Sequence, residues 1–248
     1  VFEELDNRHF GNVFHHVMES LYEPGVEYTK EKIDAIRNDK ERIKSLIMKA
    51  FAAELFSKED YDLKFEELEA RNILYFYAVV EYVNRTLMSE PVPFIFQKAE
   101  EELKYKHVLS DGHEINIGGV IDRQDICGGQ YRVIDYKTGA DKKFAIGGVD
   151  ELFNSSKLDN IKAVFQTIMY CYLIDKVYNT SQTMPVVYKI VGSKENHEIV
   201  NGLSIGKDKD TIVYSNIKDD FEEYLHALLD EIFDEQRPFS PVEDQKKC

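Results

Sequence analysis

Residues 119–139 constrain the fold of this chain more than any other segment, because two strand-like runs flank a Gly-Gly pair. Residues 131–138 are rich in β-branched and aromatic side chains, which favours a strand. Residues 118–123 predict the strand before it, and Asp125 to Gly129 have the composition of a reversal. The segment therefore predicts an antiparallel hairpin.

The predicted hairpin carries three residues that suit phosphate chemistry. Asp135 and Lys137 share one face of their strand, because side chains alternate along a strand, and the pairing brings Asp122 opposite them. Two carboxylates and a lysine at this place suit a divalent cation and the phosphate that it activates. The alternative for Asp-x-Lys by itself is a surface ion pair across the strands, worth well under about 1 kcal/mol.

The first third of the chain predicts helices. Residues 9–22, 29–56 and 64–88 carry apolar side chains near helical spacing, and Pro91 and Pro93 end the run. We expect residues 1–90 to form a helical lobe.

Strands are expected from about residue 92 to 138, and a loop-like crossover at 140–156. A helix over 158–178, a strand over 185–191 and an amphipathic helix over 219–235 complete the pattern. This order predicts an α/β fold in which helices flank a mixed β-sheet.

The charge of the chain is strongly acidic, with 46 Asp and Glu against 31 Lys and Arg and a net charge of −15. This balance argues against tight nonspecific binding of nucleic acid by the whole surface. Binding in a cleft would still work if basic residues lined it and acidic ones covered distant helices. The basic residues expected near the hairpin, interleaved with acidic ones, are Arg123, Arg132, Lys137, Lys142, Lys143, Lys157 and Lys162.

Three further features flank the hairpin. Gly11 and His15 form Gly-x-x-x-His on the first helix, and Glu100 lies in a strand-like stretch. Gln166 and Tyr170 have the i, i+4 spacing that places both on one helix face. Each has an ordinary structural explanation, since a lone histidine, a helix-surface glutamine and a core aromatic are common.

In this order, and with this spacing of Asp122, Asp135 and Lys137, the motifs resemble the PD-(D/E)XK nucleases. They are most similar to the RecB/AddB-type exonuclease domains. The resemblance covers roughly residues 9–175 and implies a restriction-endonuclease-like core. It implies that residues 1–248 are a single nuclease domain, excised from a longer protein, with a catalytic α/β core over residues 91–248.

The resemblance also implies the roles of site residues. His15, Asp122, Asp135 and the backbone carbonyl of Tyr136 would bind one or two Mg²⁺ or Mn²⁺ ions, and the imidazole suits Mn²⁺ well. Lys137 would hold the attacking water or stabilise charge on the phosphate. Two further residues complete the expected catalytic set and would support the site and contact the nucleic-acid strand: Gln166 and Tyr170. The neighbouring His16 is the alternative imidazole, but the spacing from Gly11 favours His15.

The function implied by the resemblance is a metal-dependent deoxyribonuclease, the exonuclease module of a helicase–nuclease in recombination and repair. Its partners would be single- or double-stranded DNA ends and a helicase domain or subunit. One alternative is a catalytically silent module that binds DNA ends or a helicase. Another is a metal-binding domain that acts on unrelated phosphoesters.

The cysteines add a separate expectation. Cys127, Cys171 and Cys248 are odd in number and lack paired spacing, which indicates a reduced, cytoplasmic protein. Pro238, Phe239 and Cys248 resemble the approach to a cysteine cluster in AddB-type relatives, so a [4Fe–4S] cluster would exist only in a longer parent chain; an ordinary terminal cysteine is the alternative. No apolar run reaches the length of a membrane helix.

Overall fold

The computed structural model describes residues 7–56, 62–68, 70–138, 144–154, 157–189 and 202–238. The first part of the chain is helical, as expected. Its helices are α1 (Asn7–Leu21), α2 (Lys30–Asn38), α3 (Lys40–Phe56) and α4 (Ala70–Ser89), with a short 3₁₀ helix η1 (Phe65–Glu67). The run expected over 29–56 is divided because Asp39 leaves the helical conformation and its Oδ1 accepts the N–H of Arg42, 3.0 Å away. This carboxylate caps α3.

A five-stranded sheet follows the helices. Its strands, in spatial order, are β1 (Glu27–Tyr28), β2 (Phe94–Val108), β3 (Glu114–Cys127), β4 (Gln130–Lys137) and β6 (Thr183–Lys189). The pairs are antiparallel except for β4 and β6, which run parallel. A parallel pair needs a long crossover, and here it includes α5 (Leu158–Tyr178). The mixed sheet flanked by helices confirms the predicted fold class.

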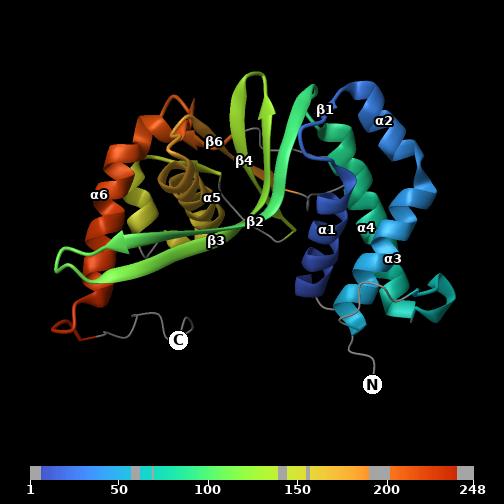
Figure 1. Ribbon diagram of the computed structural model, residues 1–248, viewed down its shortest axis with the longest axis horizontal. Coiled ribbons are helices and arrows are strands. Elements are labelled where there is room, and N and C mark those ends of the chain that lie inside the picture. Colours follow the sequence, from blue (N-terminus) through green and yellow to red (C-terminus); the bar gives the residue numbers. More distant parts are fainter. Residues whose placement is uncertain are drawn as a thin grey trace.

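The remaining elements lie at the other end of the molecule from α1–α4 (Figure 1). They are the strands β5 (Ala145–Ile146), β7 (Ser204–Ile205) and β8 (Asp210–Thr211), which form a small second sheet, the 3₁₀ helix η2 (Val149–Phe153) and the helix α6 (Tyr214–Phe233). α5 has the bounds expected for it. The residue before its first turn is Lys157, whose side chain makes no capping hydrogen bond. Cys248 lies outside the described residues, so the expectation of a cluster stays a prediction.

Two hydrophobic cores lie on opposite faces of the sheet. Ile134 and Tyr136 of β4 pack with α1–α4, whereas Val133 packs with α5 and α6. Because neighbouring residues of a strand point to opposite faces, β4 contributes to both cores. Residues near its end therefore lie between the two groups of helices (Figure 1).

Only part of the β2–β3 pair is flanked by β4. β3 pairs with β4 only from Arg123 to Cys127, and its first half pairs with β2 alone. The first half of β3 and the second half of β2, which pairs with it, form an arm that reaches past α5 towards α6 (Figure 1). The Gly128-Gly129 pair forms the turn to β4, with positive φ at both residues. Asp125, expected in that turn, instead lies fully buried within β3.

A line of side chains joins the arm to α5 and α6. His107 on the arm lies 3.2 Å from the Tyr172 hydroxyl through Nδ1 and 3.1 Å from Nδ1 of His226 through Nε2. His226 in turn lies 3.0 Å from Oγ of Ser110, which donates to Asp230 over 2.6 Å. Each neutral imidazole offers one donor and one acceptor, so this arrangement is satisfied when both histidines are uncharged.

The pKa of His107 is therefore expected to lie below 6.5, because burial and the neighbouring His226 disfavour its charged form. Nuclear magnetic resonance titration checks this, with His113 as an internal control, since its hydrogen bond to Asp111 raises the pKa. A depressed histidine pKa means that the unfolded chain takes up the proton first. His107 should thus destabilise the fold as pH falls below about 6.5, and titration of His107 above His113 would contradict this.

None of the described helices is long and apolar enough to cross a membrane.

Candidate active site

Asp122 and Asp135 meet where β3 leaves β4. The β3–β4 register ends at Arg123 opposite Ile134, and one further step along each strand gives these two aspartates. Oδ2 of Asp122 accepts the backbone N–H of Tyr136 over 2.7 Å. Both carboxylates are almost completely buried, with Asp135 only 1 % exposed. The hairpin therefore brings the two predicted carboxylates together as expected.

Glu100 stands opposite Asp122 in the β2–β3 register, at a kink in β2. The β2–β3 register passes from Ala99–Arg123 to Glu101–Ile121, and Glu100 between them has φ of 46°, in the left-handed region. Such backbone is uncommon outside glycine, and irregular strand positions of this kind redirect a side chain. The kink turns the Glu100 side chain towards α1. The ligand set expected from the sequence omitted Glu100, since strand periodicity does not predict a left-handed residue.

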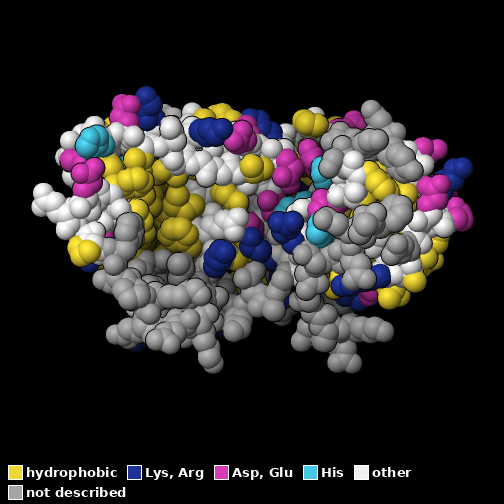
Figure 2. Space-filling model, turned by 90° about the horizontal axis from the view of Figure 1, so that it is seen from below, with side chains coloured by type: hydrophobic (Ala, Val, Ile, Leu, Met, Phe, Trp, Pro, Cys, Tyr) yellow, Lys and Arg dark blue, Asp and Glu magenta, His cyan; other side chains and the backbone are white. Residues whose placement is uncertain are grey.

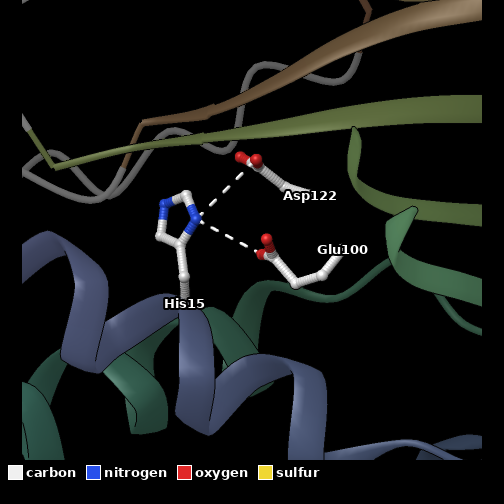
Figure 3. Close-up of side chains that lie close together, drawn as sticks. All are labelled: His15, Glu100 and Asp122. Atoms are coloured by element: carbon white, nitrogen blue, oxygen red, sulfur yellow. Dashed lines mark ion pairs between the residues drawn. The ribbon is translucent and has the colours of Figure 1, made fainter. Parts of the chain in front are cut away.

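α1 supplies the imidazole. Nδ1 of His15 lies 3.6 Å from Oε1 of Glu100 and 3.7 Å from Oδ1 of Asp122 (Figure 3). The helix approaches the end of β4 closely: a Cβ on Gly11 would lie only 3.3 Å from Oγ1 of Thr138. This contact explains the glycine of Gly-x-x-x-His. His16 is half exposed and lies 4.0 Å from Glu19, so His15 is the histidine at the site.

The lysine and the α5 residues continue the site on the other side. Nζ of Lys137 donates to Oδ1 of Asp135 and to Oε1 of Gln166, both over 2.9 Å. Nε2 of Gln166 donates to the Tyr170 hydroxyl over 2.6 Å. Gly119 of the arm makes room for Tyr170, because a Cβ there would lie 2.9 Å from the ring. The four predicted residues therefore form one hydrogen-bonded line.

The buried carboxylates shift one another's protonation. Burial and the charge of Asp122 raise the pKa of Asp135 to about 7, against the opposing effect of Lys137. Burial also raises the pKa of Asp122, although His15 and the Tyr136 N–H favour its ionised form. Burial lowers the pKa of His15, but the hydrogen bond to Glu100 and the nearby carboxylates outweigh it and the net shift is upward. A group of acids held together in this way needs a compensating positive charge.

The residues fit a divalent cation. Ligand atoms of His15, Glu100 and Asp122 lie within 4.8 Å of one another, the single such group among the described residues. Oδ2 of Asp135 is buried and makes no hydrogen bond in the described part of the chain, although the ammonium of Lys137 lies 2.9 Å from it as an ion pair. Buried polar atoms without a hydrogen bond are uncommon and call for an explanation such as an ion. Carboxylate oxygens suit Mg²⁺ and Mn²⁺, and the imidazole suits Mn²⁺.

The basic residues expected around the site are mostly engaged elsewhere. Arg123 and Arg132 are 1 % and 2 % exposed and pair with buried carboxylates, so they do not present their charges to a ligand. Lys157 pairs with Glu151 over 2.6 Å, and Lys142 and Lys143 lie outside the described residues. The space-filling view shows acidic, histidine and basic side chains together where the two halves meet (Figure 2). The two arginines lie near the site, as expected, but they cannot line a cleft, because their side chains are buried in the core.

A family model described as the PD-(D/E)XK nuclease superfamily matches residues 1–248. The chain belongs to this superfamily. Membership places the chain in a superfamily of nucleases. Asp135-Tyr136-Lys137 has the D-x-K form of the superfamily's name, whereas Ile121 rather than a proline precedes Asp122, and the roles of these residues stay a prediction. A comparison with curated protein sequences finds no match. The RecB/AddB-type branch stays a prediction.

Proposed function

We propose that this superfamily member is a deoxyribonuclease that uses Mg²⁺ or Mn²⁺ to hydrolyse phosphodiester bonds at DNA ends. The observation that carries the proposal is the group of His15, Glu100 and Asp122, with Asp135 opposite Asp122 in the β3–β4 register and bonded to Lys137. Acidic and imidazole ligands on one side and an ammonium on the other suit a phosphodiester and its attacking water.

The cation would be held by His15, Glu100, Asp122 and Asp135, and would neutralise phosphate charge and lower the pKa of a bound water. Lys137 supplies the complementary group. Its ammonium has three N–H donors, and two are committed to Asp135 and Gln166. The third can donate to a phosphate oxygen or to the attacking water, where developing charge strengthens the hydrogen bond. Gln166, held by Tyr170, keeps the lysine from turning away.

The setting of a helicase–nuclease is supported by the order of the motifs and by the charge. A net charge of −15, with both arginines of the hairpin buried, leaves little surface for nonspecific binding of DNA. A domain with such a weak hold is suited to delivery by a larger machine. We therefore propose that it acts as the exonuclease module of a RecB/AddB-type enzyme in recombination and repair.

The test compares end-labelled linear DNA, single- and double-stranded, with closed circular DNA in Mn²⁺, Mg²⁺ or EDTA. We expect shortening of linear DNA that EDTA prevents and that Asp122→Asn abolishes. Asp111→Asn is the matched control, because Asp111 is an exposed carboxylate in the turn of the arm. Cleavage that persists in EDTA or in Asp122→Asn would contradict the proposal. Binding of Mn²⁺ without cleavage would favour the silent module, and cutting of closed circles would exclude a requirement for ends.

A further inference from the structure

Directly behind the metal ligands lies a buried ionic network of Glu90, Arg123, Asp125 and Arg132. None of the four side chains is more than 2 % exposed. The Arg123 guanidinium donates to both oxygens of Glu90 and, over 2.6 Å, to Oδ2 of Asp125. Arg132 donates to both oxygens of Asp125 over 2.6 and 2.7 Å. The set contains two positive and two negative groups and is therefore neutral.

The network connects elements from both halves of the molecule. Glu90 follows α4, Arg123 and Asp125 belong to β3, and Arg132 belongs to β4. Tyr22 and Tyr188 donate their hydroxyls to Glu90 over 2.9 and 3.0 Å. Replacing a buried ionic set by an apolar core of the same volume is often neutral or stabilising, so the network by itself is weak evidence for stability.

Tyr136 joins the network to the metal ligands. Its hydroxyl accepts a hydrogen bond from Nη1 of Arg123 over 3.2 Å. Its ring meets the His15 imidazole edge to face, with centroids 5.7 Å apart and planes at 71°. Its backbone N–H holds Asp122, as described above. One residue between Asp135 and Lys137 thus contacts two ligands that come from different elements, while its far end is fixed by Arg123.

We propose that Tyr136, anchored by the Arg123–Glu90 pair, is a positioning residue that sets the separation of His15 and Asp122. The proposal rests on the proposed metal-dependent function. Its ring limits how far the imidazole can rotate, and its peptide fixes the carboxylate. The hydroxyl, which points away from the metal ligands towards Arg123, keeps the ring in place. Side chains that orient metal ligands in this way change metal affinity through those ligands, and the Tyr136 ring and hydroxyl act separately from its backbone carbonyl, which is itself an expected ligand.

Tyr22 provides a matched control. Its hydroxyl bonds to the same network through Glu90, but its ring packs on Tyr28, Phe94 and Phe96 rather than on a metal ligand. Tyr136→Phe and Tyr22→Phe each remove one hydroxyl that is hydrogen-bonded to the network. Both are milder than Glu90→Gln, which would leave Arg123 buried with a reduced counter-charge and risks unfolding.

The test measures the Mn²⁺ affinity of both variants by calorimetry, and their thermal midpoints. Nuclear Overhauser contacts between His15 and residue 136 are compared in the metal-free proteins. We expect both variants to lose similar thermal stability. Only Tyr136→Phe should bind Mn²⁺ about tenfold or more weakly and show altered contacts to His15.

Equal Mn²⁺ affinity and unchanged His15 contacts in the two variants would overturn the proposal. A parent protein that binds no Mn²⁺ would refute the proposed function, while the metal-free contacts of His15 would still decide whether Tyr136 positions the imidazole. A parent that binds Mn²⁺ but cuts no DNA would refute the nuclease activity alone, because the affinity comparison does not depend on cleavage.

Discussion

Replacing Lys137 by methionine is expected to reduce single-turnover DNA cleavage by about 10²–10³-fold, the cost of removing one preorganised donor from a reacting group. Methionine keeps much of the side-chain length and removes the charge. The fold should persist, because Asp135 already has its pKa raised to about 7 and takes up a proton when the ammonium is lost. Affinity for Mn²⁺ should change less than the rate, because an ammonium has no lone pair for an ion and Mn²⁺ displaces the proton that Asp135 takes up in the metal-free variant.

Lys189→Met is the control for this change. Lys189 stands opposite Lys137 in the β4–β6 register, and its Nζ lies over the Phe144 ring at 5.5 Å. The control removes the same charge from the neighbouring strand without removing the hydrogen bonds to Asp135 and Gln166. Comparable losses in both variants would show that Lys137 acts through general charge, and would contradict the assigned role.

Asp135→Asn is expected to stabilise the metal-free protein at pH 8 while abolishing both the Mn²⁺-induced rise in thermal midpoint and DNA cleavage. The ionised carboxylate is buried beside Asp122, and these two effects outweigh its ion pair with Lys137, because the net shift of its pKa is upward. One pKa unit corresponds to about 1.4 kcal/mol. Relief worth one pKa unit would raise the thermal midpoint of a chain this size by about 3–6 °C.

The gain should depend on pH in a defined direction. The folded-state pKa of Asp135, about 7, lies above the ordinary value of 3.8, so the folded protein binds the proton more tightly than the unfolded chain. The stability of the parent therefore falls as pH rises from about 4 through 7. The advantage of Asp135→Asn should shrink when melting is measured at pH 5 instead of pH 8. A variant that melts below its parent at pH 8 would show that this carboxylate is not a source of strain.

The hairpin and the α5 pair could be predicted from the sequence, because both depend on local spacing. Strand alternation places Asp135 and Lys137 on one face, and Gly128-Gly129 sets the reversal that brings Asp122 opposite. Helical periodicity places Gln166 and Tyr170 one turn apart, and their hydrogen bond follows from it. The mixed sheet with flanking helices follows from the same periodicities.

Other parts of the site depend on contacts between distant segments. Glu100 enters it because the β2–β3 register sets it opposite Asp122, and residue type gives no sign of that register or of the left-handed backbone at Glu100. Arg123 was expected to face a ligand, but Glu90, 33 residues earlier, meets it in the core. Side-chain alternation predicts which residues share a face, whereas packing of the whole chain decides which face is buried. Local spacing therefore determined the chemistry of the strand that carries Asp135 and Lys137. Which ligands complete the site was decided by the tertiary structure, because the contacts among α1, β2 and β3 exist only once both cores are packed.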